Sequence, residues 1–206
     1  MAEARTARSR RTRAALVAAV TDELRRSGGF TVEQVVDRVG CAPATWYAHF
    51  PSKDDAVAEA FGTVLDDLTR RVVAIFGLDQ LERLGPAGFA RHVEAELVTF
   101  FRTESLVFRA ALARLSEHRE IRGRYRAAEN AVLVAVGEFL TLAGTAGLLP
   151  SIGTADRARA VLVVSQGFNN PRLLRAPADD SLHELLAMAL AAALAGTTAG
   201  VSRGGA

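Results

Sequence analysis

The segment from Pro43 to Phe50 carries side chains whose types and spacing suit recognition of another molecule. At about 100° per residue of a helix, Ala44, Thr45 and Ala48 share one outward face, and Tyr47 and His49 lie at its two edges. The hydroxyl groups can form hydrogen bonds with base edges, and the methyl groups can contact the methyl group of thymine. Such a face suits a helix inserted into the major groove of DNA.

This segment contains no Arg, Asn or Gln, the residues that make bidentate contacts with bases. Base recognition would therefore depend on Thr45, on Tyr47 and on methyl contacts. Tyr47 could instead be a half-buried core residue. However, Trp46 and Phe50, four residues apart, already provide a core-facing side for this helix, which favours an outward Tyr47.

The preceding residues predict a helix and a turn that would position this face. Thr31 can cap a helix whose valines share one side; these are Val32, Val35, Val36 and Val39. Gly40 then ends that helix, and Pro43 is suited to the first position of the next one. Two short helices around a glycine-centred turn are typical of a helix-turn-helix.

The stretch from Thr31 to Lys53 resembles the TetR family of transcriptional regulators. The matching residues are Thr31, Gly40, Thr45-Trp46-Tyr47, His49-Phe50 and Pro51-Ser52-Lys53. The resemblance covers about the first third of the chain, and the combined spacing is specific. Two positions depart from the family: Ala42 replaces a usual capping Ser or Thr, and Trp46 replaces a smaller Leu or Phe.

The resemblance implies a division of the chain and a set of DNA contacts. Residues 1–52 would form the DNA-binding domain, and residues 53–206 the domain that senses a ligand and dimerises. The positions that match DNA-facing residues of the family are Pro43, Ala44, Thr45, Tyr47 and Ala48. Those that match phosphate contacts or their neighbours are Thr31, His49 and Lys53.

The resemblance also implies partners and a mode of action. We expect a homodimer on a palindromic operator in double-stranded DNA, and a repressor released by a small, largely apolar effector. A regulator that needs its ligand to bind DNA is the alternative. The helices expected at 155–170 and 182–195 would form the dimer, with Leu186 and Leu190 in the interface, because each carries more apolar surface than one protomer can bury.

Charge is distributed unevenly along the chain. Residues 1–53 contain nine basic and five acidic side chains, a net +4 against +2 for the whole chain. This asymmetry indicates a polyanionic partner. We expect residues 1–11 to form a disordered arm whose Arg8, Arg10 and Arg11 reach the minor groove. Lys53 lies in the first turn of a helix, where a phosphate would stabilise it; the alternative is an exposed lysine without a role.

Helical periodicity continues through the rest of the chain and predicts an all-α protein. The expected helices cover residues 12–27, 53–76, 86–102, 105–115, 119–146, 155–170 and 182–195, with caps at Ser52, Thr154 and Ser181. Residues 131–149 are apolar almost all round, which also fits a membrane span. Glu138, three glycines and Pro150 favour a buried core helix and no membrane.

No catalytic motif supports an all-helical enzyme, the main alternative function. The four histidines lie far apart, so we predict no metal site and no cofactor. The single cysteine suits a reducing, cytoplasmic location. Candidate residues for the effector pocket combine aromatic side chains with isolated polar groups: Phe61, Phe100, Phe108, Arg109, Tyr125, Glu138, Gln166 and Asn169.

Overall fold

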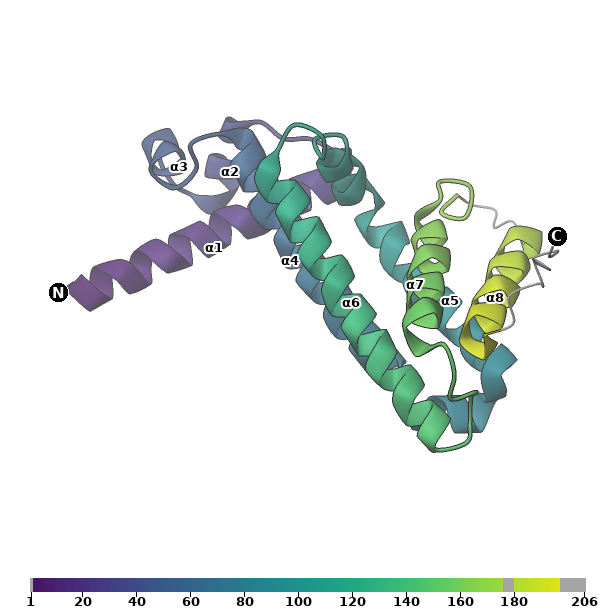
Figure 1. Cartoon of the computed structure of the whole chain (residues 1–206). Coiled ribbons are helices and arrows are strands. Elements are labelled where there is room, and N and C mark those ends of the chain that lie inside the picture. The colour runs from purple at the N-terminus through teal and green to yellow at the C-terminus, as the bar shows by residue number, and fades with distance from the viewer. Residues whose placement is uncertain (1, 176–179, 197–206) are drawn as a thin grey trace, which may run out of the picture. The chain divides into compact units, whose positions relative to one another are not determined.

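The computed structural model describes residues 2–175 and 180–196, and within them helices are the only regular secondary structure (Figure 1). The predicted all-α class is therefore confirmed. The helices are α1 (Ala2–Ser27), α2 (Val32–Val39), α3 (Pro43–His49), α4 (Lys53–Ile75), α5 (Leu78–Leu112), α6 (Arg119–Thr145), α7 (Thr154–Gln166) and α8 (Asp180–Ala195), with a 3₁₀ turn at Gly167–Asn169.

These helices form two compact units. The first unit comprises Met1–Asp67 and Thr103–Ala128, and the second comprises Leu68–Arg102 and Glu129–Ala206. Helices α4, α5 and α6 therefore each contribute residues to both units. The expected division between residues 52 and 53 is a division of function, and it stays a prediction.

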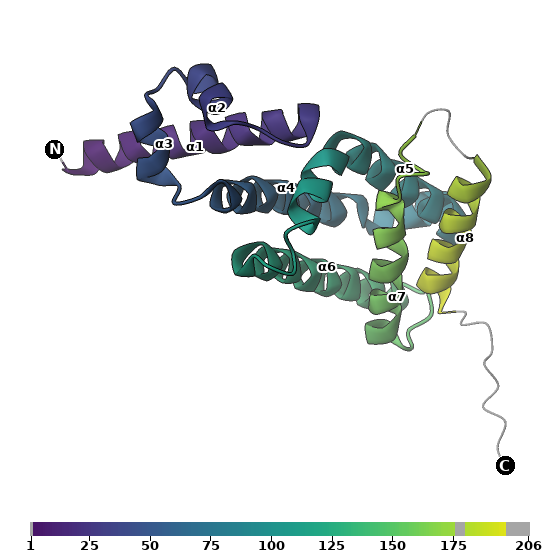
Figure 2. The ribbon, with the colours of Figure 1, turned by 90° about the horizontal axis from the view of Figure 1, so that it is seen from above.

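The first unit contains the predicted helix-turn-helix. Helix α2 lies beside α1, and α3 packs against α2 (Figure 2). The valine side of α2 and the aromatic side of α3 provide apolar surface against which α1 buries its own stripe. Trp46 is 1% exposed, and its ring centre lies 5.7 Å from that of Phe30 and 4.9 Å from that of Phe50. The core-facing role expected for Trp46 and Phe50 is confirmed.

The start of α1 differs from the expectation. The arm predicted to be disordered, residues 1–11, is helical from Ala2 onward, and α1 does not begin at Thr12. Its first turns contain Ala, Glu and Arg and no glycine or proline. These residues favour a helix, and extending a helix that is already nucleated by a buried stripe costs little.

Three other predicted boundaries are wrong. Helix α5 continues through residues 102–105, and its irregular residue is Gly85, at φ 65° and ψ 168°. The buried carboxylate of Glu104 within this stretch pairs with Arg25, so its polar residues do not mark a loop. Gly153, in the left-handed region, precedes α7 in place of a Thr154 cap. Helix α8 begins at Asp180, one residue before the expected cap.

The second unit is built around three phenylalanine rings. Phe76, Phe89 and Phe139 contact one another with ring centres 5.1 to 5.6 Å apart. Helix α7 packs against α8, and the buried Arg157 of α7 donates to the carbonyl oxygens of Pro150 and Leu194. Burial lowers the pKa of Arg157. This contact fixes the C-terminal end of α8, where carbonyl groups lack helical partners.

Helix α6 is long and apolar enough to cross a membrane by length and composition, because it contains an 18-residue window with a mean hydropathy of 1.3. One of its faces belongs to the protein core through Val136, Phe139 and Leu140. Val134 and Leu142, on another face, are 60% and 55% exposed. Both faces are apolar, which explains why the sequence alone also suggested a membrane span.

Candidate nucleic-acid interface

A reciprocal cap fixes the beginning of α2. The backbone N–H of Gln34 donates to Oγ1 of Thr31 at 3.2 Å, and the backbone N–H of Thr31 donates to Oε1 of Gln34 at 2.8 Å. This arrangement satisfies two N–H groups that would otherwise lack partners at the helix start. The prediction that Thr31 caps this helix is confirmed.

Gly40 determines the path between α2 and α3. Its φ and ψ of 71° and 40° lie in the left-handed region, where a side chain is unfavourable. Its N–H donates to the carbonyl oxygen of Asp37, and that of Cys41 donates to the carbonyl of Val36. The chain thus leaves α2 in a tight turn, and α3 restarts at Pro43.

Helix α3 presents small residues and a tyrosine to the exterior. Pro43, Ala44 and Ala48 are exposed, Thr45 is partly exposed, and Tyr47 is 66% exposed. A large aromatic side chain with so much exposed surface contributes little to the core. It is instead available to contact a partner.

Lys53 has a partner that the sequence analysis missed. Its Nζ donates to the carbonyl oxygen of Phe30 at 2.5 Å and lies 4.8 Å from the centre of the Phe30 ring. The ammonium group has three donors, so this bond leaves others for a phosphate. Ser52, just before it, accepts from the N–H of Asp55 at 3.2 Å, which confirms the predicted cap of α4.

Most of the basic side chains counted in residues 1–53 are already paired. Arg25 binds Glu104 at 2.6 Å, and this hydrogen bond raises the pKa of Arg25. Arg26 and Arg38 both contact the buried carboxylate of Glu23, at 2.5 and 2.8 Å. These arginines therefore hold the unit together, and the net charge overstates what is available to a polyanion.

The remaining arginines lie at the start of α1. Arg8, Arg10 and Arg11 are exposed, and their guanidinium groups have no partner among the described residues. They are carried by a helix about 10 Å across, whereas the minor groove is about 6 Å wide. This geometry favours contacts with phosphates over insertion into the minor groove.

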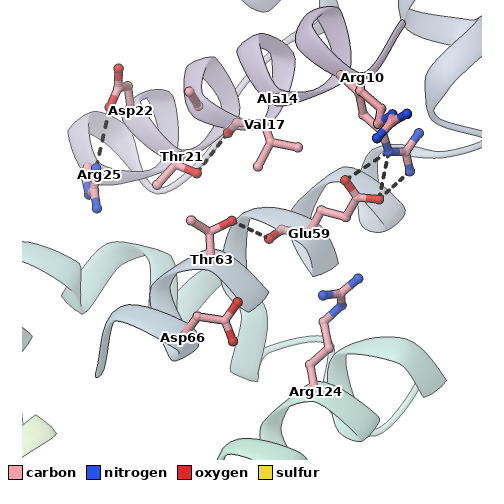
Figure 3. Close-up of a pocket in the computed structure, with 12 residues that line it drawn as sticks. Arg10, Ala14, Val17, Thr21, Asp22, Arg25, Glu59, Thr63, Asp66 and Arg124 are labelled. Atoms are coloured by element: carbon pink, nitrogen blue, oxygen red, sulfur yellow. Dashed lines mark hydrogen bonds and ion pairs between the residues drawn. The ribbon is translucent and has the colours of Figure 1, made fainter. Parts of the chain in front are cut away.

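A cleft of about 550 Å³ lies between α1, α4 and α6 within the first unit (Figure 3). At one end Glu59 extends from α4 toward the Arg10 end of α1, and at the other lie Thr21 and Arg25. Its wall also includes Arg13, which binds Glu59. Charges of both signs line the cleft, so it is not a simple anion site.

The candidate effector residues fall into two groups. Phe61, Phe108 and Tyr125 form an aromatic cluster in the first unit, with ring centres 5.1 and 6.2 Å from that of Phe61. Arg109 also belongs to the first unit, where its side chain is exposed. The other four, Phe100, Glu138, Gln166 and Asn169, are in the second unit.

A largely apolar groove of about 710 Å³ lies between α6 and α7 of the second unit. Val134, Leu142 and Ala158 contribute to its apolar lining, and Glu138 is one of its few charged residues. Gln166 lies elsewhere, where its Nε2 donates to Glu129 at 2.7 Å. Of the candidate effector residues, only Glu138 lines this groove.

Arg13 and Glu59 are site residues that the sequence analysis did not identify. Arg13 precedes the buried Leu16 and Val20 by three and seven residues, so it lies on the face of α1 that packs against the rest of the unit. A charged residue in line with an apolar stripe is a recognisable signal for a buried or paired charge. Glu59, its partner on α4, carries no such sequence signal.

Comparison with known proteins gives structural matches only. No protein-family model and no curated protein matches the sequence. Solved structures do match along nearly the whole chain. A protein from Mesorhizobium loti described as a TetR-family transcriptional regulator aligns with 91% of this chain and 95% of its own, at 16% identity and a TM-score of 0.70.

Two further matches have similar extents. A TetR transcription regulator from Haloarcula marismortui is 17% identical and covers 90% of this chain and 96% of its own, with a TM-score of 0.67. A transcriptional regulator from Rhodococcus sp. Rha1 is 24% identical and covers 88% and 93%, with a TM-score of 0.61. The fold of this chain is the fold of the TetR-family regulators.

Proposed function

We propose that this chain, which has the TetR-regulator fold, is a DNA-binding transcriptional regulator and not an enzyme. The exposed face of α3 carries the proposal: Tyr47, Ala44 and Ala48 face outward above a buried Trp46. A short helix held by its own turn, with small residues at its centre, fits the major groove. Thr45 and Tyr47 would contact bases, while Lys53 and the α1 arginines would contact phosphates.

The test begins with random duplexes. The full chain is incubated with a pool of random double-stranded oligonucleotides, bound duplexes are selected over several rounds, and the enriched sequence is used in gel-shift assays with unlabelled competitor. We expect an enriched, roughly palindromic sequence that competitor DNA of shuffled sequence displaces poorly. Equal competition by shuffled DNA would contradict sequence-specific regulation.

We further propose that the protein acts as a homodimer. Its supporting observation is the exposed apolar surface of α7 and α8, where Val163, Leu185 and Met188 are 60 to 66% exposed. A two-fold dimer presents two copies of α3, which requires half-sites about one DNA turn, 34–36 Å, or a multiple apart. Both DNA binding and reduced Cys41 suit a cytoplasmic protein.

A small, largely apolar effector that releases the protein from DNA completes the proposal. Helix α4 begins at Lys53, directly after the helix-turn-helix, and continues into the second unit. A ligand that favours one position of α4 would therefore alter the position of α3. A regulator that needs its ligand to bind DNA is the second candidate, and the direction of the ligand's effect distinguishes the two.

A further inference from the structure

Arg13 connects three elements around the recognition helix. Its Nε lies 3.1 Å from both carboxylate oxygens of Glu59 on α4, and Nη2 donates to the same carboxylate. Nη1 donates to the backbone carbonyl of His49, the last residue of α3. Its guanidinium carbon also lies 4.6 Å from the centre of the Phe50 ring. One side chain of α1 therefore holds the end of α3 and the side of α4.

The chemistry of these contacts gives them a defined direction. A guanidinium that binds a carboxylate through two nitrogens is fixed in orientation as well as position. The carbonyl at the end of a helix carries partial negative charge and lacks a helical partner, so it is a good acceptor for a cation. The Arg13 and Glu59 side chains are 39% and 24% exposed, and solvent weakens the pair without removing its geometry.

Helix α3 has few other contacts that could fix its angle. It has seven residues, its Ala42 cap makes no side-chain hydrogen bond, and Trp46 is its one buried residue. Helices this short are not stable without tertiary contacts. The beginning of α3 is set by the Gly40 turn and its middle by Trp46, and its end is held by the buried Phe50 together with the Arg13 contacts.

We propose that Arg13 and Glu59 are positioning residues for sequence recognition, which they support without contacting a base. The inference rests on the proposed DNA-binding function. Contacts with bases need α3 at one angle, whereas phosphate contacts tolerate small tilts and carry no sequence information. Loss of the pair therefore reduces the preference for the selected sequence more than it reduces binding to DNA in general.

Glu59→Gln separates positioning from simple charge. The substitution raises the net charge by one, so electrostatics alone would strengthen binding to every duplex. A positioning role predicts the opposite change, a loss of affinity, for the selected duplex. We expect Glu59→Gln to bind the selected duplex about tenfold more weakly than the wild type does, the scale of one charge-assisted hydrogen bond. The variant should bind a shuffled duplex as tightly as the wild type or more tightly. Arg13→Lys, which keeps the charge but not the bidentate geometry, should lower the same ratio of affinities.

Asp66→Asn is the matched control, because it makes the same change in charge on α4 in the wall of the same cleft. It should leave the ratio of selected to shuffled affinity unchanged. A partly unfolded variant loses affinity for both duplexes in proportion, so the ratio still reports positioning. Ratios for Glu59→Gln and Arg13→Lys equal to the wild-type ratio would overturn the inference. A wild type that selects no sequence would instead overturn the proposed function.

Discussion

At the scale of the residue, the α3 hydroxyl groups provide the sharpest test of base recognition. Tyr47→Phe and Thr45→Val each remove one oxygen, and Tyr47 is 66% exposed. Stability should change by less than about 0.5 kcal/mol. The preference among operator variants should change by about 1–3 kcal/mol at one base position. Gel shifts over a set of single-base variants measure this, and equal weakening on every variant would show that the residue only positions the protein.

Lys53 requires a substitution that distinguishes two roles. Lys53→Met keeps the apolar stem over Phe30 but removes the charge. The dependence of log affinity on log salt should become shallower by about 1 if Lys53 binds a phosphate. Loss of the bond to the Phe30 carbonyl should also cost about 1 kcal/mol of stability. Lys53→Arg serves as the control with retained charge, and an unchanged salt slope for Lys53→Met would assign the lysine to structure alone.

At the scale of the element, glycine substitutions separate the turn from the helices. Gly40→Ala places a side chain at φ 71°, and no atom lies within 4 Å of the added carbon. Its cost is therefore conformational, about 1 kcal/mol. Gly123→Ala, inside α6 and equally free of contacts, should stabilise by about 0.5–1 kcal/mol. The urea unfolding midpoint should fall for Gly40→Ala and rise for Gly123→Ala. An unchanged midpoint for Gly40→Ala would mean that the turn relaxes to accept the side chain.

The elements were largely predictable where local chemistry decides them. Thr31, Gly40 and Pro43 set their own caps and turn, and the valine spacing of α2 needs no knowledge of the rest of the fold. The predicted helix boundaries were wrong where residues distant in the sequence, or a neighbouring glycine, determine the local structure. Glu104 is helical in a polar stretch because Arg25 lies against it, and Gly153 displaced Thr154 as the cap of α7.

The same distinction applies to the candidate site. The outward face of α3 follows from helical geometry and the size of Trp46. The partners of Arg13, Arg38 and Lys53 come from other elements or the loop at Phe30, and no local pattern specifies them. The charge count consequently suggested nine available cations, whereas five of them make contacts within the first unit.

At the scale of the whole molecule, the proposed dimer is tested through exposed apolar residues. Leu185→Glu with Met188→Glu should give a folded monomer that binds the operator weakly, because the two residues are 61% and 60% exposed in one protomer. Val73→Glu, at 58% exposed on α4, is the matched control and should remain dimeric. Sedimentation velocity measures the change, and a wild-type monomer at micromolar concentration would contradict the proposal.

The expected interface residue Leu190 is unsuitable for that experiment. It was predicted to lie in the interface but is completely buried within the protomer, and Leu186 is partly buried. A buried charge at Leu190 would lack a partner and unfold the second unit. The periodicity of α8 identifies an apolar helix, but it does not show which of its faces packs internally.

Ligand release makes a reciprocal prediction. If a compound that binds the protein releases it from DNA, operator DNA must weaken binding of that compound by the factor by which the compound weakens operator binding, typically about 1–3 kcal/mol of coupling. Calorimetric titrations of the compound with and without operator measure the two affinities. Substitution of Phe61, Leu65 or Leu68 on α4 should reduce the factor. Equal compound affinities would contradict coupling, and tighter binding with operator would identify a ligand-dependent activator.

The helical start of α1 has a thermodynamic consequence. A flexible arm would lose conformational entropy as it became ordered on DNA, and its folding would make the heat-capacity change of binding more negative. Residues 6–11 are already helical, so Arg8, Arg10 and Arg11 would contact phosphates without that entropy loss. The contribution of these three arginines to the free energy of DNA binding should therefore come mostly from the release of counterions, which is entropic and nearly independent of temperature.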